Sequence, residues 1–129
     1  MKILLFDDSY EYFESANYML IREGYTVDII DNSLDAYNKT ENIDGYDVIL
    51  LDLMFIAEGI NLEENPEVGI LLYKRIRNRN KKIPIIIVSA LNEKRLMNYW
   101  DKDENTTYIS KPLSQEAKEL INAIKSLTK

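Results

Sequence analysis

The chain contains neither cysteine nor histidine. Without cysteine it can form no disulfide framework and no thiolate metal site. Without histidine it can have no histidine-based catalytic triad, no histidine-ligated zinc and no phosphohistidine of its own. Chemistry at a functional site must therefore depend on carboxylates, hydroxyls and lysine. The missing cysteines also agree with a reducing cytoplasm, which is the location we expect.

The sequence also lacks a surplus of basic residues and any long apolar stretch. Its formal net charge of -6 argues against a nucleic-acid partner, whose binding surface is normally basic. The first apolar stretch breaks at Asp7, too early for a signal peptide, and no run approaches the roughly 18 apolar residues of a membrane span. With 129 residues the chain is expected to be one domain without a membrane partner.

Short apolar runs alternate along the chain with longer segments of helical periodicity. Continuous apolar runs of this length are typical of strands that are buried on both faces. The expected strands cover residues 3–6, 26–30, 48–53, 85–88 and 107–109, and the expected helices cover 10–23, a short segment from 33, 69–80, 92–101 and a segment from 114. The sequence therefore predicts an α/β fold, with a doubly wound five-stranded parallel sheet of the flavodoxin-like type and helices on both faces.

Some side chains of the helical segments carry expectations of their own. Ser33 and Ser114 are candidate N-caps, because a serine hydroxyl can accept a hydrogen bond from the first turn of a helix. Trp100 is expected to pack on the surface or at an interface of the fourth helix, away from the functional site. The arginines of the segment 69–80 are expected to spread toward solvent, beside its apolar face: Arg75, Arg77 and Arg79.

Polar side chains stand where four of the predicted strands end. They are Asp7 and Asp8 after the first run, Asp52 after the third, Ser89 after the fourth and Lys111 after the last. Because the carboxyl ends of parallel strands meet at one edge, where open α/β sheets bind ligands, we expect these side chains to lie close together. For the adjacent acidic pair taken alone, a solvated turn with a helix-capping carboxylate is an equally good interpretation.

Asp52 favours the interpretation as a site, because it lies inside an otherwise apolar stretch. A buried carboxylate without a partner costs several kcal/mol, and Asp7 and Asp8 would add charge of the same sign. Two cations could offset this charge, namely Lys111 and a hard metal ion. An all-oxygen ligand set without histidine or cysteine suits Mg²⁺. Carboxylates, a metal, a lysine and the Ser89 hydroxyl are together the parts that a phosphoryl group needs.

On these residues the chain resembles the receiver domains of two-component response regulators, in particular the stand-alone chemotaxis type. The resemblance covers essentially the whole chain, and its motifs are weak singly but specific in combination. The matching residues stand in the order of the family: Asp7-Asp8, Asp52, Ser89-Ala90, Tyr108 and Lys111-Pro112.

The resemblance implies how the acidic residues divide their work. Asp52 would be the phosphoacceptor, attacking a phosphohistidine to form an acyl phosphate, and would also contact the metal. Asp8 would bind Mg²⁺ directly, and Asp7 directly or through water. The backbone carbonyl of Met54 would complete the protein ligands. The residues alone support the same assignment, because in-line attack needs a nucleophilic carboxylate, a metal and a fixed cation.

The resemblance also implies a switch and a set of partners. Lys111 would pair with one phosphoryl oxygen, and Ser89 would donate a hydrogen bond to another. Tyr108 would be the aromatic switch, turning inward as Ser89 moves toward the phosphate. A histidine kinase or histidine phosphotransfer protein would supply the phosphoryl group. The signal would pass to a protein target over the face of the fourth helix, fifth strand and fifth helix, with no DNA-binding output domain and no enzyme activity on other substrates.

The segment after Asp52 departs from the family pattern. Gly69 is the best match for the family's glycine, which implies a loop insertion at about 55–68; this is either a tolerated surface loop or a lid that tunes access to Asp52. The altered loop is the only support for an alternative function, a receiver-like binding module that does not use phosphorylation. A phosphatase with an aspartyl nucleophile is the less favoured alternative, because neither Asp7 nor Asp52 begins the Asp-x-Asp motif that such enzymes need.

Overall fold

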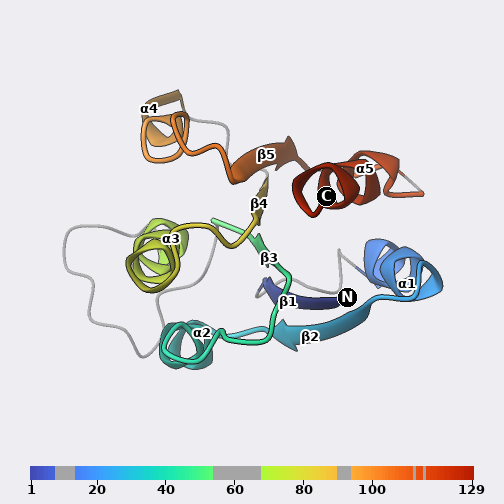
Figure 1. Cartoon of the computed structure of the whole chain (residues 1–129), viewed down its shortest axis with the longest axis horizontal. Coiled ribbons are helices and arrows are strands. Elements are labelled where there is room, and N and C mark those ends of the chain that lie inside the picture. Colours follow the sequence, from blue (N-terminus) through green and yellow to red (C-terminus); the bar gives the residue numbers. More distant parts are fainter. Residues whose placement is uncertain (8–13, 54–67, 90–93, 112, 115) are drawn as a thin grey trace.

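The computed structural model describes residues 1–7, 14–53, 68–89, 94–111, 113–114 and 116–129. Within these residues, five strands alternate with five helices along the chain (Figure 1). The strands are β1 (Lys2–Phe6), β2 (Thr26–Ile30), β3 (Val48–Leu51), β4 (Ile85–Ser89) and β5 (Thr106–Ser110). The helices are α1 (Glu14–Arg22), α2 (Ser33–Lys39), α3 (Val68–Arg79), α4 (Lys94–Met97) and α5 (Lys118–Leu127). Residues 55–67 of the expected insertion lie outside the described part of the chain.

The strands form one parallel sheet in the order β2-β1-β3-β4-β5. Each strand coincides with a predicted apolar run, because aliphatic and β-branched residues can be buried on both faces of a sheet. Every residue of β3 and β4 is buried. The predicted doubly wound, flavodoxin-like fold is therefore confirmed. The differences concern strand ends: β3 stops at Leu51 rather than Leu53, and β5 is longer than the predicted 107–109.

Each face of the sheet is covered by its own helices, because successive strand residues point to opposite faces. On one face, α2, α3 and the end of α4 pack on side chains such as Phe6 and Leu51. On the other face, α1 and α5 pack on side chains such as Leu5 and Val88. Figure 1 shows the sheet between these two groups of helices. With both faces closed, the carboxyl edge of the sheet is the place left for a site.

α2 differs from the prediction in its N-cap, and α4 differs in where it ends. The N-cap of α2 is Asn32, whose extended backbone lets its side chain accept a hydrogen bond from the Asp35 amide at 2.8 Å. Ser33 is instead the first residue of the helix and is buried, so the prediction of Ser33 as the cap was wrong. Within the described residues α4 covers Lys94–Met97 and ends at Met97 rather than Asp101, because the Tyr99 and Trp100 backbone N–H groups bond three residues back.

The last helix begins later than predicted. Ala117 adopts a left-handed backbone with φ of 52°, so the helix starts only at Lys118. Ala117 therefore holds the N-cap position in place of Ser114, although the Ser114 hydroxyl does accept a hydrogen bond from the Lys118 backbone N–H at 3.3 Å, as predicted. The Ser114 backbone N–H and hydroxyl both donate to the Glu119 carboxylate, each at 2.6 Å. Leu120, Ile121 and Ile124 are buried and form the apolar face of this helix.

Gly69, in the first turn of α3, lies against the backbone that follows Asp52. A Cβ atom at this position would lie 2.2 Å from the Leu53 Cα and 2.8 Å from its carbonyl carbon and oxygen. No side-chain rotation can relieve such a contact, because the obstructing atoms are backbone. Glycine is therefore required here so that α3 can approach the end of β3, and the spacing of α3 from the sheet depends on it.

We expect Gly69→Ala to destabilise the protein by about 2 kcal/mol, because overpacking against backbone costs more than the roughly 1 kcal/mol that alanine gains in a helix. Urea unfolding followed by circular dichroism would measure the change. Asn78→Ala at an exposed position of the same helix is the matched control and should leave stability unchanged or slightly raised. A Gly69→Ala variant as stable as the wild type would contradict the close approach.

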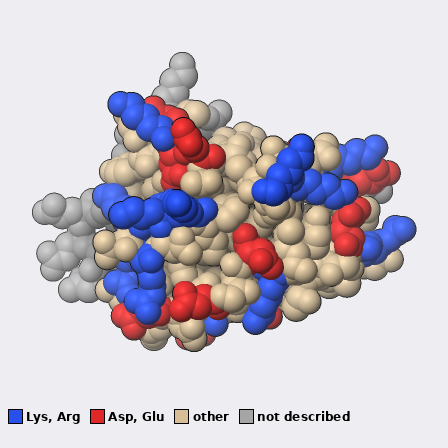
Figure 2. Space-filling view, in the orientation of Figure 1, with Lys and Arg blue, Asp and Glu red and all other residues tan. Residues whose placement is uncertain are grey.

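Charged side chains of both signs are interspersed over the face seen in Figure 2. This mixture agrees with a modest net charge of -6. None of the described helices combines the length and the apolar composition that a membrane-spanning segment needs.

Candidate functional site

Asp7 and Asp52 lie side by side at the carboxyl ends of two neighbouring strands. Both residues continue the backbone hydrogen bonding of the sheet: the Asp7 N–H donates to the Ile30 carbonyl at 3.1 Å, and the Asp52 N–H donates to the Phe6 carbonyl at 2.9 Å. The two residues are almost completely buried, with 1% and 5% of their surface exposed. The end of the sheet therefore holds two carboxylates that are shielded from water.

Lys111 brings its ammonium group between these carboxylates. Its Nζ lies 2.8 Å from Asp7 Oδ2 and 2.9 Å from Asp52 Oδ2. Because Lys111 follows β5, two strands away from β3, its side chain must reach past the end of β4. Burial lowers the pKa of the Lys111 ammonium, but hydrogen bonds and charge from the two carboxylates outweigh burial and raise this pKa above its usual value. The three groups together carry a formal charge of minus one.

Ser89 and Tyr108 stand next to this ion cluster. Ser89 ends β4 and is completely buried. Its backbone carbonyl accepts two hydrogen bonds, one from the Tyr108 hydroxyl at 3.0 Å and one from the Lys111 backbone N–H at 3.1 Å. The Tyr108 side chain is half-buried and packs against the core under α3. Two hydrogen bonds to the Ser89 carbonyl thus connect the end of β4 to Tyr108, the predicted switch residue, and to Lys111, the predicted cation.

The donors present fit a hard divalent cation. Mg²⁺ takes oxygen ligands and is usually held by one or two carboxylates together with water. Asp7 and Asp52 supply such carboxylates, and a single ammonium leaves one negative charge unbalanced. Two other predicted ligands, Asp8 and Met54, lie outside the described residues. Within the described part of the chain, no group of three or more acidic residues gathers as a metal site.

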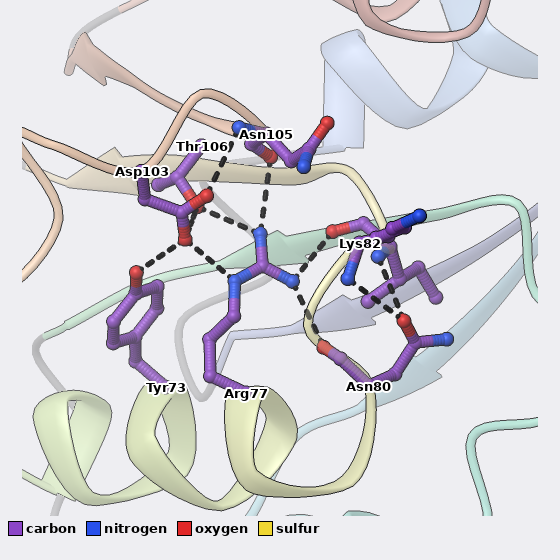
Figure 3. Close-up of polar contacts among 8 residues, drawn as sticks. Tyr73, Arg77, Asn80, Lys82, Asp103, Asn105 and Thr106 are labelled. Carbon is purple, nitrogen blue, oxygen red and sulfur yellow. Dashed lines mark hydrogen bonds and ion pairs between the residues drawn. The ribbon is translucent and has the colours of Figure 1, made fainter.

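The sequence did not reveal a second polar cluster, which is part-buried, formed around Arg77 and shown in Figure 3. We call it the Arg77 cluster; its members are Tyr73, Arg77, Asp103, Asn105 and Thr106. The Arg77 Nε lies 2.6 Å from Asp103 Oδ2, and only 12% of the Arg77 side chain is exposed. The prediction that Arg77 points to solvent was therefore wrong. The available signal was that Tyr73 and Arg77, four residues apart, share a face of the helix.

The surroundings of the arginines next to Arg77, and of Trp100, also became clear only from the structure. Arg79 is exposed as predicted. Arg75 is largely covered instead, with its guanidinium 3.7 Å from the centre of the Tyr37 ring. The prediction of Trp100 as a surface residue was wrong, since only 5% of it is exposed. The indole packs in the core between Tyr73 and Tyr108, because the short α4 turns it inward.

Known proteins share both this sequence pattern and this fold. Residues 3–125 match the profile of the response regulator receiver domain. The transcriptional regulatory protein CusR of Escherichia coli K12 is 33% identical over 92 residues, which cover 70% of this chain but only 36% of CusR. The receiver domain of Francisella response regulator 1452 superposes with a TM-score of 0.74 at 27% identity, over 98% of this chain and 95% of that one. Response regulator protein TrrA of Thermotoga maritima, solved in complex with Mg(2+)-BeF, gives a TM-score of 0.74 at 26% identity, over 98% and 97%.

The sequence match and the structure point to the same family. The profile covers nearly all of the chain, from the first strand into the last helix. The parallel sheet has the strand order in which Asp7, Asp52 and Lys111 converge at one edge. The chain therefore belongs to the response regulator receiver domain family.

Proposed function

We propose that this receiver domain accepts a phosphoryl group on Asp52 from a phosphohistidine of a partner protein. The observation that carries the proposal is the position of the Asp52 carboxylate, buried at the end of a central strand and 2.9 Å from the Lys111 ammonium. The ammonium group offsets the negative charge of this buried carboxylate and leaves it available as a nucleophile. The family of the chain supports the same role.

In the proposed reaction, an Asp52 carboxylate oxygen attacks the phosphorus atom and the P–N bond to the donor imidazole breaks. The electron pair of that bond leaves with the imidazole nitrogen, and the product on Asp52 is an acyl phosphate. Lys111 then pairs with a phosphoryl oxygen, since its ammonium already lies beside the reacting carboxylate. Ser89 donates a hydrogen bond from its hydroxyl to another phosphoryl oxygen. Such transfers depend mainly on positioning and on charge stabilisation.

Asp7, Asp8, Asp52 and the Met54 carbonyl would hold Mg²⁺ in this proposal. The ion would supply positive charge to the phosphoryl oxygens during transfer. The all-oxygen donors of Asp7 and Asp52, and a relative that was solved with Mg(2+)-BeF, support this choice of metal. Asp7 would also keep its contact with Lys111, and this contact would hold the ammonium group beside Asp52.

The phosphorylated domain would signal through Tyr108 to a protein partner. The Tyr108 hydroxyl already donates a hydrogen bond to the Ser89 backbone carbonyl. A movement of Ser89 toward the phosphoryl group would therefore shift the Tyr108 ring. We propose the face of α4, β5 and α5 as the contact surface and the cytoplasm as the location. The domain would change only its own phosphorylation state. The donor would be a histidine kinase or a histidine phosphotransfer protein.

Incubation with Mg²⁺ and acetyl phosphate, followed by intact mass spectrometry, tests the proposal. We expect the mass of one added phosphoryl group in the wild type and none in Asp52→Asn. Asp44→Asn, at an exposed turn, is the matched control and should be modified like the wild type. Omitting Mg²⁺ should greatly reduce the modification.

Two results would argue against this function. Modification of Asp52→Asn to the wild-type extent would remove Asp52 as the acceptor. A folded wild type that gains no phosphoryl group from acetyl phosphate or phosphoramidate, and binds no beryllofluoride with Mg²⁺, would favour a binding module that works without phosphorylation.

A further inference from the structure

One face of α3 connects the phosphoacceptor strand to the aromatic core. Gly69, Tyr73 and Arg77 are each four residues apart and therefore lie in one row on the helix. Gly69 abuts the Leu53 backbone directly after Asp52. Tyr73 reaches Trp100, with ring centres 6.3 Å apart and planes at 69°. Gly69 in this row therefore contacts the chain at the end of β3, and Tyr73, one turn further along the helix, contacts the aromatic core.

Trp100 lies between this row and the predicted switch residue. Its indole stacks on the Tyr108 ring, with centres 6.2 Å apart and planes at 12°. The Tyr108 hydroxyl in turn donates to the Ser89 carbonyl at 3.0 Å. We call Tyr73, Trp100 and Tyr108 the aromatic stack. Through this stack, α3 and the end of β4 are joined by direct contacts that pass through the buried indole.

The far end of the aromatic stack is fixed by the Arg77 cluster (Figure 3). The Tyr73 hydroxyl donates to Asp103 Oδ2 at 2.6 Å, and Arg77 donates to the same oxygen at 2.6 Å. Arg77 also donates to Thr106 Oγ1 at the start of β5 and to the Asn105 carbonyl. The Tyr73 side chain is thus fixed at its hydroxyl by Asp103 and at its backbone by α3. Its ring therefore gives Trp100 a defined surface to pack against.

We propose that Trp100 is a positioning residue for the phosphorylation switch. Its indole holds Tyr108 on the Ser89 carbonyl, and through Tyr73 it ties that position to the helix that packs beside Asp52. In this position the Tyr108 ring packs against the core and its hydroxyl bonds to the Ser89 carbonyl. In the proposed switch this is the position of the phosphorylated form, so Trp100 would favour that form. This inference rests on the proposed function. By linkage, an interaction that favours the phosphorylated form must also tighten the binding of a phosphoryl analogue at Asp52.

Beryllofluoride binding in the presence of Mg²⁺ tests this role, measured by isothermal titration calorimetry. We expect Trp100→Leu to bind beryllofluoride about two- to tenfold more weakly than the wild type, which is the factor that corresponds to loss of one aromatic pair. Trp100→Phe keeps an aromatic ring and should weaken binding about twofold. Tyr99→Leu changes the neighbouring, exposed aromatic residue and should bind like the wild type.

The comparison separates positioning from stability. Trp100→Leu will lower the melting temperature in either case, because a buried indole is lost. A purely structural role leaves the affinity of the folded variant unchanged, so binding is measured at a temperature where circular dichroism shows every variant folded. If Trp100→Leu does not fold, Trp100→Phe carries the test. Equal affinity of the folded Trp100 variants and the wild type would overturn the inference, whereas a wild type that binds no beryllofluoride would overturn the proposed function itself.

Discussion

Lys111→Met is expected to destabilise the protein by about 4 kcal/mol at pH 7. The substitution removes the ammonium group that lies 2.8 and 2.9 Å from two buried carboxylates. Breaking a buried ion pair from one side typically costs about 3–5 kcal/mol. The loss has an upper limit because one carboxyl can take up a proton instead. For an aspartate with a free pKa of about 3.9, that costs about 4 kcal/mol at pH 7.

The same argument fixes the pH dependence of the variant. Folded Lys111→Met would hold one more proton than its unfolded chain, so its stability should fall by about 1.4 kcal/mol for each unit of rising pH between pH 5 and 7. Urea unfolding at several pH values would measure this slope, which the wild type should lack. An addition of Mg²⁺ should recover part of the stability if the ion binds the freed carboxylates.

Two control variants make the result specific to the buried ammonium. Lys111→Arg keeps a cation and should lose less stability than Lys111→Met. Lys125→Met removes a lysine whose side chain is 58% exposed and whose partner is Glu23 at the surface, and it should change stability by less than about 1 kcal/mol. A Lys111→Met variant that matches Lys125→Met at pH 7 would contradict the ionised, buried site.

Arg77→Met is expected to cost about 4 kcal/mol, although it lies far from the carboxylates at the strand ends. The Arg77 guanidinium donates hydrogen bonds to five acceptors: Asp103 Oδ2, Thr106 Oγ1 and the carbonyls of Asn80, Ile83 and Asn105. Methionine would keep the aliphatic stem but leave the part-buried Asp103 carboxylate and several carbonyls without this donor. Removing one partner of such a pair typically costs about 3–5 kcal/mol.

At acidic pH the difference in stability between the wild type and Arg77→Met should become smaller, because Asp103 is the charged group that Arg77 stabilises. Burial alone would raise the pKa of Asp103, but hydrogen bonds from Tyr73, Arg77, the Asn105 backbone and Thr106 outweigh burial and lower it from 3.8 to about 2. A lowered pKa means that this stabilisation is present above pH 4 and is lost as the pH falls toward 2. Only 16% of the Asp103 side chain is exposed, so solvent screens this stabilisation little. The free energy of unfolding of the wild type should therefore fall by about 2 kcal/mol over this pH range.

Measurements of stability at pH 7 and near pH 2.5 would check both expectations. The gap between the wild type and Arg77→Met should narrow at the acidic pH. Arg77→Lys should recover only part of the stability, because an ammonium cannot reproduce the planar fork of donors. Arg79→Met, on the exposed face of the same helix, should be close to neutral. A gap that stays constant with pH would show that Asp103 is not the charge concerned.

The fold and the strand-end site could be predicted because both are local patterns in the sequence. An apolar run such as Val48–Leu51 is typical of a buried strand, and a parallel sheet brings the ends of its strands to one edge. A charged residue that ends such a run must have a partner, and the sequence offered two candidates for Asp52, Lys111 and a hard metal ion. The structure adds the distance between Asp52 and Lys111, while their roles with Asp8 and Met54 belong to the proposed function.

The bounds of the helices followed less directly from the sequence. Serine is a good N-cap in general, but Asn32 has the extended backbone at the start of α2, and Ala117 breaks the segment before α5. These choices depend on local backbone conformation, which neighbouring contacts decide. The requirement for glycine at position 69 is similar, because it exists only when α3 has docked against Leu53.

The sequence by itself determined the parallel sheet, the edge at which the site lies and the charges that meet there, since periodicity and burial of charge are properties of short segments. Only the tertiary structure decided that Arg77 is largely covered and that Trp100 lies against Tyr108. Arg77 meets Asp103 across 26 positions of sequence, and Trp100 is turned inward by the end of a four-residue helix. Contacts of this kind arise from how α3 and the segment between α4 and β5 pack on the same face of the sheet, and no local pattern specifies that packing.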